Sequence, residues 1–377
     1  MNDRIFLSPP YLGGEEKKFV NEAFETNWIA PLGPNVAAFE EEMAVYSGAP
    51  YTLALSSGSS AIHLALKYLG VKAGDVVFCS SFTFSGSCNP AAYENAELVF
   101  IDSEPETWNM SPKALKKAFE WAEKENKIPK AVIVVDLYGS SANWDEILPI
   151  CKQYNVPVVE DSAEALGAEW NGKKCGLFGD LGIYSFNGNK IITTSGGGMV
   201  LCNSQVEREK MLFWATQSRE KALHYEHKEV GYNYRLSNLC AGVGRGQLRI
   251  IDKKIQKRKE IYENYRELVK QINATMAPYS EKCSPNFWMS VIVLEDGVDP
   301  EKIVVHMNEN HNVETRPAWK PMHLQPVFQS CMYFSHNDDG SMLCEEMYKH
   351  GLCLPSGEAL TYEDQVRIVN AIKEIVG

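Results

Sequence analysis

The chain of 377 residues lacks the cysteine patterns and the positive charge that mark several classes of protein. Its ten cysteines include no C-x-x-C pair and none at zinc-ligand spacing from histidine, so we expect free thiols and no metal site. With 37 Lys and Arg against 49 Asp and Glu, the net charge is −12. An acidic surface repels phosphate polymers and anionic lipid, so neither nucleic acid nor a membrane is an expected partner.

Long apolar segments are missing as well. The first ten residues, MNDRIFLSPP, contain no apolar core of a secretory signal. The longest uncharged stretch, Met43–Leu66, is interrupted by turn formers at 47–50 and 56–60, so it is not expected to span a membrane. Hydrophobic residues still make up 45% of the chain, enough for a substantial core. We therefore expect a soluble protein of the reducing cytoplasm.

Short apolar runs alternate with amphipathic segments between Tyr51 and Asn203. The runs predict strands and the segments predict helices, namely strands at 51–55, 76–79, 98–101, 131–135 and 156–159 and helices at 59–69, 112–124 and 144–154. Strands separated by helices favour an α/β fold, with a mostly parallel sheet covered by helices on both faces. Ligands bind such sheets at the carboxyl ends of the strands, so the residues that follow each strand are the candidate site.

The remainder of the chain predicts a bridging helix and a smaller domain. A helix is expected at 207–218, and a long helical pattern rich in Lys, Arg and Glu runs from Asn238 to about Ile272. Strands are expected near 287–294 and 313–316, and a final helix at 362–376. We place an N-terminal segment and a large domain at residues 1–245, and the bridging helix with a small α+β domain at 246–377.

Two predicted strands end in residues that suit a charged ligand. Ser56-Ser57-Gly58-Ser59-Ser60 follows the first strand, where free N–H groups, a helix dipole and hydroxyls form a phosphate cradle. An ordinary helix N-cap would explain the same residues. The run at 156–159 continues into Glu160-Asp161, and a buried acid needs a cationic partner unless it too is an N-cap.

A single lysine, Lys190, follows among uncharged residues. Turn formers flank it and three glycines follow it, within a segment rich in Ile, Phe and Met. Such surroundings favour the neutral amine that a Schiff base needs, which is a better explanation than an exposed loop lysine. The order of cradle, acid and then lysine, 190 − 161 = 29 residues later, is typical of pyridoxal 5'-phosphate (PLP) enzymes. The spacing thus predicts a PLP enzyme of the aspartate-aminotransferase fold, fold type I.

Longer motifs sharpen this prediction. Motifs of one known group stand in order over nearly the full length of the chain, namely Leu7-Ser8-Pro9-Pro10, Trp28–Pro34, Ser57–Leu66 and Gly231–Leu236. In these motifs the chain resembles the nucleotide-sugar aminotransferases of the DegT/DnrJ group. The segments Ser185–Gly198 and Glu314–His323 are similar to one branch of that group. That branch acts on UDP-linked 4-keto-6-deoxy-N-acetylglucosamine in bacillosamine-type pathways.

The resemblance implies a role for each matching residue. Lys190 would bind the cofactor and later move protons between cofactor and sugar, while Asp161 would pair with the pyridine nitrogen. Asn233 would reach the phosphate from the neighbouring subunit of a homodimer with shared active sites. The remaining cofactor positions are the phosphate-binding Gly58, Ser59, Ser60 and Ser185, the ring-stacking Phe84, and Glu164, which stands beside the ring hydroxyl where many relatives have glutamine.

The sugar nucleotide would bind near Arg316, Trp319, Lys320 and His323. This basic, aromatic-flanked group suits a diphosphate and a stacked base, although a solvated surface turn fits the pattern equally well. The resemblance implies transfer of an amino group from L-glutamate, through PLP and pyridoxamine phosphate, to the 4-keto group of a UDP-linked 4-keto-6-deoxy-N-acetylhexosamine. The UDP-4-amino-4,6-dideoxy sugar would serve surface glycans and protein glycosylation.

Three alternatives stay open. The same chemistry could act on a dTDP- or GDP-linked 4-keto hexose, and only the branch resemblance argues against it. A non-catalytic PLP-binding regulator on the same fold is disfavoured because Lys190, Asp161 and Ser185 are all present. A PLP lyase or dehydratase would release ammonia and a keto sugar; the family's dehydratases lack the lysine that this chain keeps.

Overall fold

The centre of the molecule is a large sheet with strand order β1-β9-β8-β5-β4-β2-β3-β14 in the computed structural model, which describes residues 3–376. In that order the strands are β1 (Tyr51–Leu55), β9 (Gly198–Cys202), β8 (Leu181–Ser185), β5 (Val158–Asp161), β4 (Ala131–Val135), β2 (Val76–Ser80), β3 (Glu97–Ile101) and β14 (Met332–Phe334). β9 runs antiparallel to both of its neighbours, and all other neighbouring pairs are parallel. The predicted mostly parallel sheet is confirmed.

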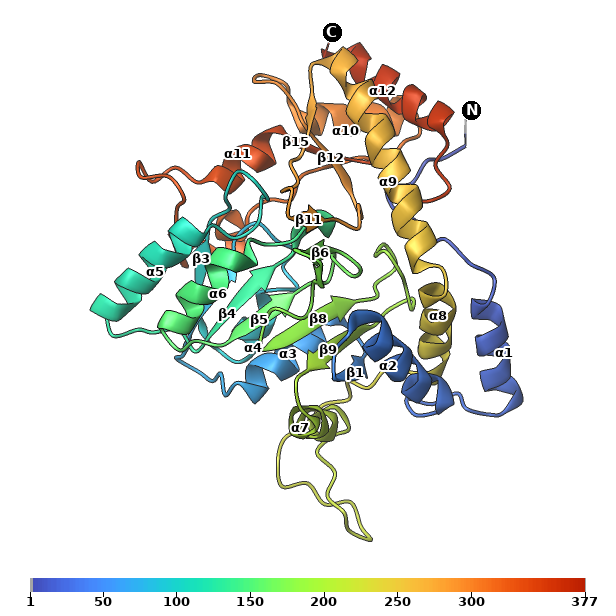
Figure 1. Cartoon of the computed structure of the whole chain (residues 1–377), viewed down its shortest axis with the longest axis vertical. Helices are drawn as coiled ribbons and strands as arrows, with labels where there is room; N and C mark the ends of the chain where they lie inside the picture. Colours follow the sequence, from blue (N-terminus) through green and yellow to red (C-terminus); the bar gives the residue numbers. More distant parts are fainter. Residues whose placement is uncertain (1–2, 377) are drawn as a thin grey trace.

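Helices cover both faces of this sheet (Figure 1). Successive residues of a strand point to opposite faces, and in β5 Val159 packs in the core under α3 and α7 whereas Val158 packs in the core under α5 and α6. The helices of this part are α1 (Glu16–Glu25), α2 (Pro34–Ser47), α3 (Gly58–Tyr68), α4 (Asn89–Tyr93), α5 (Pro112–Lys124), α6 (Trp144–Gln153) and α7 (Gln205–Ala215). Burial on both faces explains why the strands are near-continuous apolar runs.

A second, smaller sheet has the order β10-β12-β15-β13 and shares a core with α9, α10 and α12. Its strands are β10 (Thr275–Met276), β12 (Ser290–Val293), β15 (Gly351–Leu354) and β13 (Arg316–Pro317), and the helices nearby are α8 (Asn238–Leu248), α9 (Ile251–Leu268), α10 (Pro300–Asn310), α11 (Leu343–His350) and α12 (Tyr362–Val376). Short elements complete the chain: β6 (Glu169–Trp170), β7 (Lys173–Lys174), β11 (Cys283–Ser284), η1 (Leu137–Gly139), η2 (Val269–Ile272), η3 (Met322–Leu324) and η4 (Pro326–Phe328).

The long helix predicted from Asn238 to Ile272 is wrong in one respect, because the chain turns between α8 and α9. Close packing explains the turn. A Cβ at Gly246 would lie 2.6 Å from the Glu16 backbone, so the glycine allows α8 to pack directly against α1, and the Ile250 side chain at the turn packs against Gly13. α9 then leaves in the direction of the small sheet (Figure 1).

The predicted boundary at residue 245 lies inside α8. Contacts also cross this boundary in both directions, since β14 joins the large sheet beside β3 and Ile5 forms a bridge with Val313. The two-domain division therefore stays a prediction, and a single cut does not separate the two sheets. Among the described residues, we find no helix that is long and apolar enough to cross a membrane.

Candidate active site

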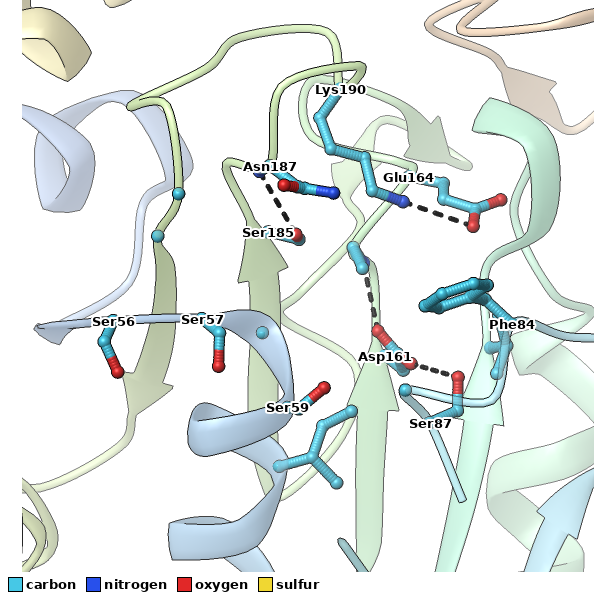
Figure 2. Close-up of a pocket in the computed structure, with 17 residues that line it drawn as sticks. Ser56, Ser57, Ser59, Phe84, Ser87, Asp161, Glu164, Ser185, Asn187 and Lys190 are labelled. Carbon is cyan, nitrogen blue, oxygen red and sulfur yellow. Dashed lines mark hydrogen bonds and ion pairs between the residues drawn. The ribbon is translucent and has the colours of Figure 1, made fainter. Parts of the chain in front are cut away.

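A cavity of about 300 Å³ opens at the carboxyl ends of the central strands. Its walls come from the turn between β1 and α3, the loop after β2, the ends of β5 and β8, and the loops around Lys190 and Gly197 (Figure 2). These segments are far apart in the sequence. They meet because parallel strands end at a common edge, as the sequence predicts.

One end of the cavity suits a phosphate. Ser57 caps α3, whose first N–H groups have no partner within the helix, and the positive end of the helix dipole adds to them. The Ser59 and Ser185 side chains both line the cavity. A Cβ on Gly58 would lie 3.2 Å from the Ser185 Cβ, so a larger residue would crowd the close approach of the helix start to β8.

Ser60 lies outside this cavity wall. Its hydroxyl donates to the Ser57 carbonyl at 2.8 Å, and its backbone N–H donates to the Ser57 hydroxyl at 3.0 Å. Both donors are therefore used to cap the helix rather than aimed at a ligand. The predicted phosphate contact of Ser60 becomes a positioning role, because the residue fixes the turn that carries Ser59.

Asp161 ends β5 and is buried at the floor of the cavity. The Ser87 hydroxyl donates to its Oδ2 at 2.6 Å, and the Ala163 N–H donates to its Oδ1 at 3.2 Å (Figure 2). Burial raises the pKa of Asp161, while these hydrogen bonds and the Lys190 charge oppose the shift. A buried carboxylate in this position is stabilised by a cationic N–H, which is what a protonated pyridine ring offers.

Lys190 enters the cavity from above in Figure 2 and faces Glu164. Its Nζ lies 3.4 Å from Glu164 Oε1 and 4.3 Å from the centre of the Trp288 ring. The Trp288 indole N–H also donates to the Asn189 carbonyl at 2.6 Å, which holds the loop that carries the lysine. An amine so placed is confined between one carboxyl group and one aromatic face.

Glu164 is buried and receives the Tyr138 backbone N–H at 2.7 Å. Burial raises its pKa to about 7, against the opposing effects of the Lys190 charge and the Tyr138 hydrogen bond. Near neutral pH this carboxyl group is therefore close to half ionised. A glutamine at the same position would have no such equilibrium.

Phe84 forms the remaining wall and exposes 61% of its surface. A Cβ on the neighbouring Gly86 would lie 3.1 Å from Ser59 Oγ and 3.2 Å from the Phe84 ring, so a larger residue would fill the space between phosphate end and ring wall. The residues fit PLP: a helix start and hydroxyls for the phosphate, an acid for the ring nitrogen, an aromatic wall and an amine. When bound, PLP supplies an aldehyde that takes up amino groups and a ring that accepts electrons.

The four residues predicted to bind the sugar nucleotide do not lie together in one site. Trp319 and Lys320 line a second cavity, of about 490 Å³, which shares Phe84 with the first. Arg316 is exposed and pairs with Glu314 at 3.1 Å, while His323 is buried between the Ser81 hydroxyl at 2.7 Å and Glu345 at 3.1 Å. His323 is thus a hydrogen-bonded core histidine, and neither it nor Arg316 lines either of the two cavities.

Asn233 also lies away from the cavity wall. It forms a bridge with Thr216 at the base of a projecting segment, and its amide oxygen accepts from the Gln217 side chain at 3.1 Å. No contact within the chain brings it to the phosphate end among the described residues. The predicted contact of Asn233 with the phosphate in a second copy of the chain therefore stays a prediction.

Sequence reasoning missed several residues of the site. Ser87 follows a predicted strand by a few residues, so a search of every strand end for hydroxyls near an acid could have found it. Tyr138 follows the predicted strand 131–135 and could have been found in the same way, whereas Trp288 had no signal, because its part in the site depends on how distant segments pack. Gly86 also lines the cavity and lies outside the sequence motifs, whereas Asn187 lines it within the 185–198 motif, where its turn bears on the substrate subgroup.

Comparison with known proteins supports the geometric interpretation. The model of the DegT/DnrJ/EryC1/StrS aminotransferase family matches residues 10–373. EpsN of Bacillus subtilis (strain 168), to which a pyridoxal phosphate-dependent aminotransferase activity is ascribed, is 50% identical over 99% of this chain and 96% of its own length. GDP-perosamine synthase of Escherichia coli O157:H7 is 34% identical over 97% of this chain and 96% of its own length.

Another relative, which matches a smaller share of the chain, is named for a UDP-linked sugar. The UDP-4-amino-4,6-dideoxy-N-acetyl-beta-L-altrosamine transaminase of Campylobacter jejuni is 36% identical over 62% of this chain and 61% of its own length. Among solved structures, the aminotransferase TlmJ from Streptoalloteichus hindustanus superposes with a TM-score of 0.88 at 26% identity, covering 99% of this chain and 98% of its own. The predicted fold type I is confirmed.

Proposed function

The chain belongs to the DegT/DnrJ/EryC1/StrS aminotransferase family, and from this premise we propose that it transfers an amino group from L-glutamate to the 4-keto group of a UDP-linked 4-keto-6-deoxy-N-acetylhexosamine. The product would be a UDP-4-amino-4,6-dideoxy sugar of the bacillosamine type, used in glycan synthesis and protein glycosylation. The aminotransferase assignment follows from the family; the donor, the nucleotide and the sugar are the proposal.

The observation that carries the proposal is the placement of Lys190 opposite Glu164 above the buried Asp161 (Figure 2). Lys190 holds a proton at Nζ or gives it up, and Glu164 at 3.4 Å is the nearest carboxyl group to receive it. Asp161 stabilises positive charge at the cavity floor, with Ser87 fixing its orientation. Ser59, Ser185 and the start of α3 hold an anion at the opposite end.

The second cavity supports a nucleotide substrate. It lies next to the first, with Phe84 as common wall, and Trp319 offers an aromatic ring while Lys320 offers a positive charge. The Phe84 and Trp319 rings are 5.8 Å apart and tilted; Phe84 lines both cavities and Trp319 lines the second. A sugar in the first cavity with its diphosphate and base in the second would place the reacting carbon beside Lys190.

The choice of UDP rests on the motifs at 185–198 and 314–323 and on the partial relative from Campylobacter jejuni. A GDP-linked 4-keto-6-deoxy hexose is the second candidate, because GDP-perosamine synthase matches almost the whole chain. Both candidates share the 4-keto group, so the chemistry at Lys190 is common to them. They differ only in what the second cavity must hold.

We also propose a homodimer with shared sites. Residues 217–234 project beyond α7 (Figure 1) and present the exposed side chains of Leu223, Tyr225 and Val230. Apolar residues at the tip of a projection are typical of a surface that packs against another chain. Asn233 lies at the base of this segment, where docking of a second copy would carry it to the partner's phosphate end.

All ten cysteines are unpaired, in keeping with the cytoplasm as compartment.

The first experiment is a visible-light titration of the purified, PLP-loaded protein with UDP-, GDP- and dTDP-linked 4-amino sugars. A true product runs its half of the reaction backwards and converts the bound cofactor to pyridoxamine phosphate, so the absorption band of the PLP form is lost. We expect loss with the UDP-linked N-acetylated sugar and with L-glutamate. Loss with the GDP-linked sugar alone would replace the UDP proposal with the second candidate.

A mixed dimer tests the shared site. Lys190→Ala and Asn233→Ala chains, each inactive or weakened alone, are co-purified through two different tags. If Asn233 acts on the partner's site, the mixed dimer contains one intact site and recovers up to half of the wild-type activity. No recovery would contradict the shared site while leaving the aminotransferase assignment in place.

A further inference from the structure

Two histidines and a glutamate meet where α10 and α12 lie side by side, at the top of Figure 1. His306 lies on α10, His311 directly follows that helix, and Glu374 lies in the last turn of α12. His306 Nε2, His311 Nε2 and Glu374 Oε2 are each 3.1 Å from the other two. This triad belongs to the small sheet's side of the molecule and lines neither cavity of the proposed active site.

Hydrogen bonds alone do not satisfy these three atoms. An ionised Glu374 has no proton to give, and each neutral imidazole has at most one at Nε2, so three contacts share at most two protons. If both imidazoles donate to Glu374, their two N–H groups face each other at 3.1 Å. The equal sides also set an angle of 60° between the two imidazole nitrogens at Oε2, tighter than two good hydrogen bonds to one oxygen require.

A divalent cation resolves this conflict. Zinc binds imidazole nitrogen and carboxylate oxygen at about 2.0–2.2 Å in a tetrahedral arrangement, which places neighbouring ligand atoms about 3.3 Å apart. The observed 3.1 Å spacing is close to that value on all three sides. A metal ion just above the triangle would contact all three atoms and leave a fourth position for water.

The surroundings hold the rings in place. The side-chain amide nitrogen of Asn310 lies 2.8 Å from His306 Nδ1, so the other ring nitrogen, Nε2, is directed at the triad. A metal-bound His306 keeps its proton at Nδ1, so metal binding requires the Asn310 amide to turn over and present its oxygen as the acceptor. Arg367 donates to the His311 carbonyl and fixes that residue at the end of α10. The two imidazoles are 17% and 21% exposed and the carboxylate 55%, so solvent reaches the triad from one side.

We propose that His306, His311 and Glu374 form a binding site for a divalent cation of the zinc class, in which the metal ties the end of α10 to α12. Affinity would follow the usual order of transition metals, with copper, zinc and nickel preferred over magnesium and calcium, because imidazole favours the former. The site is independent of the proposed aminotransferase reaction. Its effect is to stabilise the helices that cover the small sheet.

The test uses the full-length, PLP-loaded protein, freed of metal with a chelator and titrated with Zn²⁺ in a calorimeter. We expect one tight equivalent in the wild type that is lost in His311→Gln and in Glu374→Gln. Both substitutions keep side-chain size at a partly exposed position, so folding should survive. Asn310→Ala should lower the affinity about 10–100-fold, the usual effect of losing a partner of a metal-binding histidine.

His224→Gln is the matched control, because His224 is exposed and contacts a single carboxylate, Glu226, at 3.1 Å. This variant should bind Zn²⁺ like the wild type and show the same rise in unfolding temperature with the metal. Co²⁺ serves as an optical probe, since thiolate ligation would give a near-ultraviolet charge-transfer band and the triad would not. Unchanged Zn²⁺ affinity in His311→Gln and Glu374→Gln, a thiolate band, or no tight equivalent in the wild type would each overturn the proposal.

Discussion

The cofactor cavity and the segment from Glu314 to His323 make an instructive contrast, because both were predicted from short motifs rich in polar residues. In the cavity, residues separated by more than a hundred positions in the sequence, such as Ser59 and Lys190, line the same space. In the segment, four residues within eight positions point to three different places: Arg316 to solvent, Trp319 and Lys320 to the second cavity, and His323 into the core.

The difference follows from the backbone. Parallel strands end at a common edge, so residues that follow them converge whatever their separation in the sequence. In the segment, only the two residues of β13 and the first two of η3 are in regular structure, with turns between them, so each side chain is directed by its own local partner. Closeness in the sequence is therefore weaker evidence for a joint site than a common position after neighbouring strands.

Removal of Lys190 gives the largest expected effect. It is also the most direct test of the difference between the cofactor cavity and the Glu314–His323 segment. We expect Lys190→Ala to lower aminotransferase activity by about 10⁴-fold, because Lys190 is the only lysine among the described residues that lines this cavity beside Glu164. The fold should persist, as judged by circular dichroism and the unfolding temperature. Lys320→Ala is the matched control from the segment, and it should reduce turnover far less. Equal losses in the two variants would contradict the assignment of Lys190.

Glu164→Gln tests the electrostatics of the cavity. The carboxyl pKa rises from 4.5 to about 7 on folding, so the folded protein holds this proton more tightly than the unfolded chain. The contribution of Glu164 to stability is therefore full below pH 4.5 and is lost as the pH rises toward about 7. The upper bound of this loss is on the order of 3 kcal/mol, at about 1.4 kcal/mol for each pKa unit.

Urea unfolding of the wild type and of Glu164→Gln across this pH range measures the effect. Asp136 and Glu160, which are buried together and have raised pKa values, change the stability of both proteins in the same direction. The difference between the two curves therefore isolates Glu164. We expect the variant to gain stability relative to the wild type as the pH rises. A constant difference would mean that Glu164 does not titrate in this range.

Asp161→Asn should weaken PLP binding about 10- to 150-fold, the usual range for a hydrogen bond to a charged group. Ser87→Ala should weaken it less, because Asp161 keeps its charge and the Ala163 N–H and loses only the 2.6 Å hydrogen bond. Equilibrium titration of the cofactor-free proteins with PLP measures both. If Ser87→Ala weakened PLP binding as much as Asp161→Asn, then Ser87 rather than Asp161 would be the main contributor to PLP binding at the floor of the cavity.

The same contrast explains how far sequence reasoning reaches. The strand Tyr51–Leu55, the strand Ala131–Val135 and the helix Pro112–Lys124 have the predicted bounds, because apolar runs buried on two faces and a helical apolar stripe are local patterns. β5 was predicted two residues too early, since Glu160 and Asp161 are charged. Glu160 is nevertheless part of the strand, where it accepts the N–H groups of Gly176, Phe178 and Gly179.

Features that depend on distant packing had no local signal. The addition of β14 to the large sheet, and the contact of Trp288 with Lys190, are set by how the last third of the chain returns to the first. Lys190 and Asp161 could be predicted because Lys190 is the only charged residue of its segment and Asp161 ends a strand at the expected spacing of 29 residues before it. Trp288 could not, because an aromatic residue before a strand is ordinary in any core.

The smallest expected effects separate the members of the Glu314–His323 segment. Trp319→Ala should raise the KM for the sugar nucleotide about tenfold with little change in kcat, because the ring lines the second cavity and loses contact area with the bound base. Arg316→Ala should change KM by less than about twofold, since among the described residues its side chain pairs only with Glu314, and the ion pairs of exposed side chains contribute little. Steady-state kinetics at saturating glutamate measure both constants. If Arg316→Ala raised KM as much as Trp319→Ala, the diphosphate would have to reach β13, and the segment would act as one site after all.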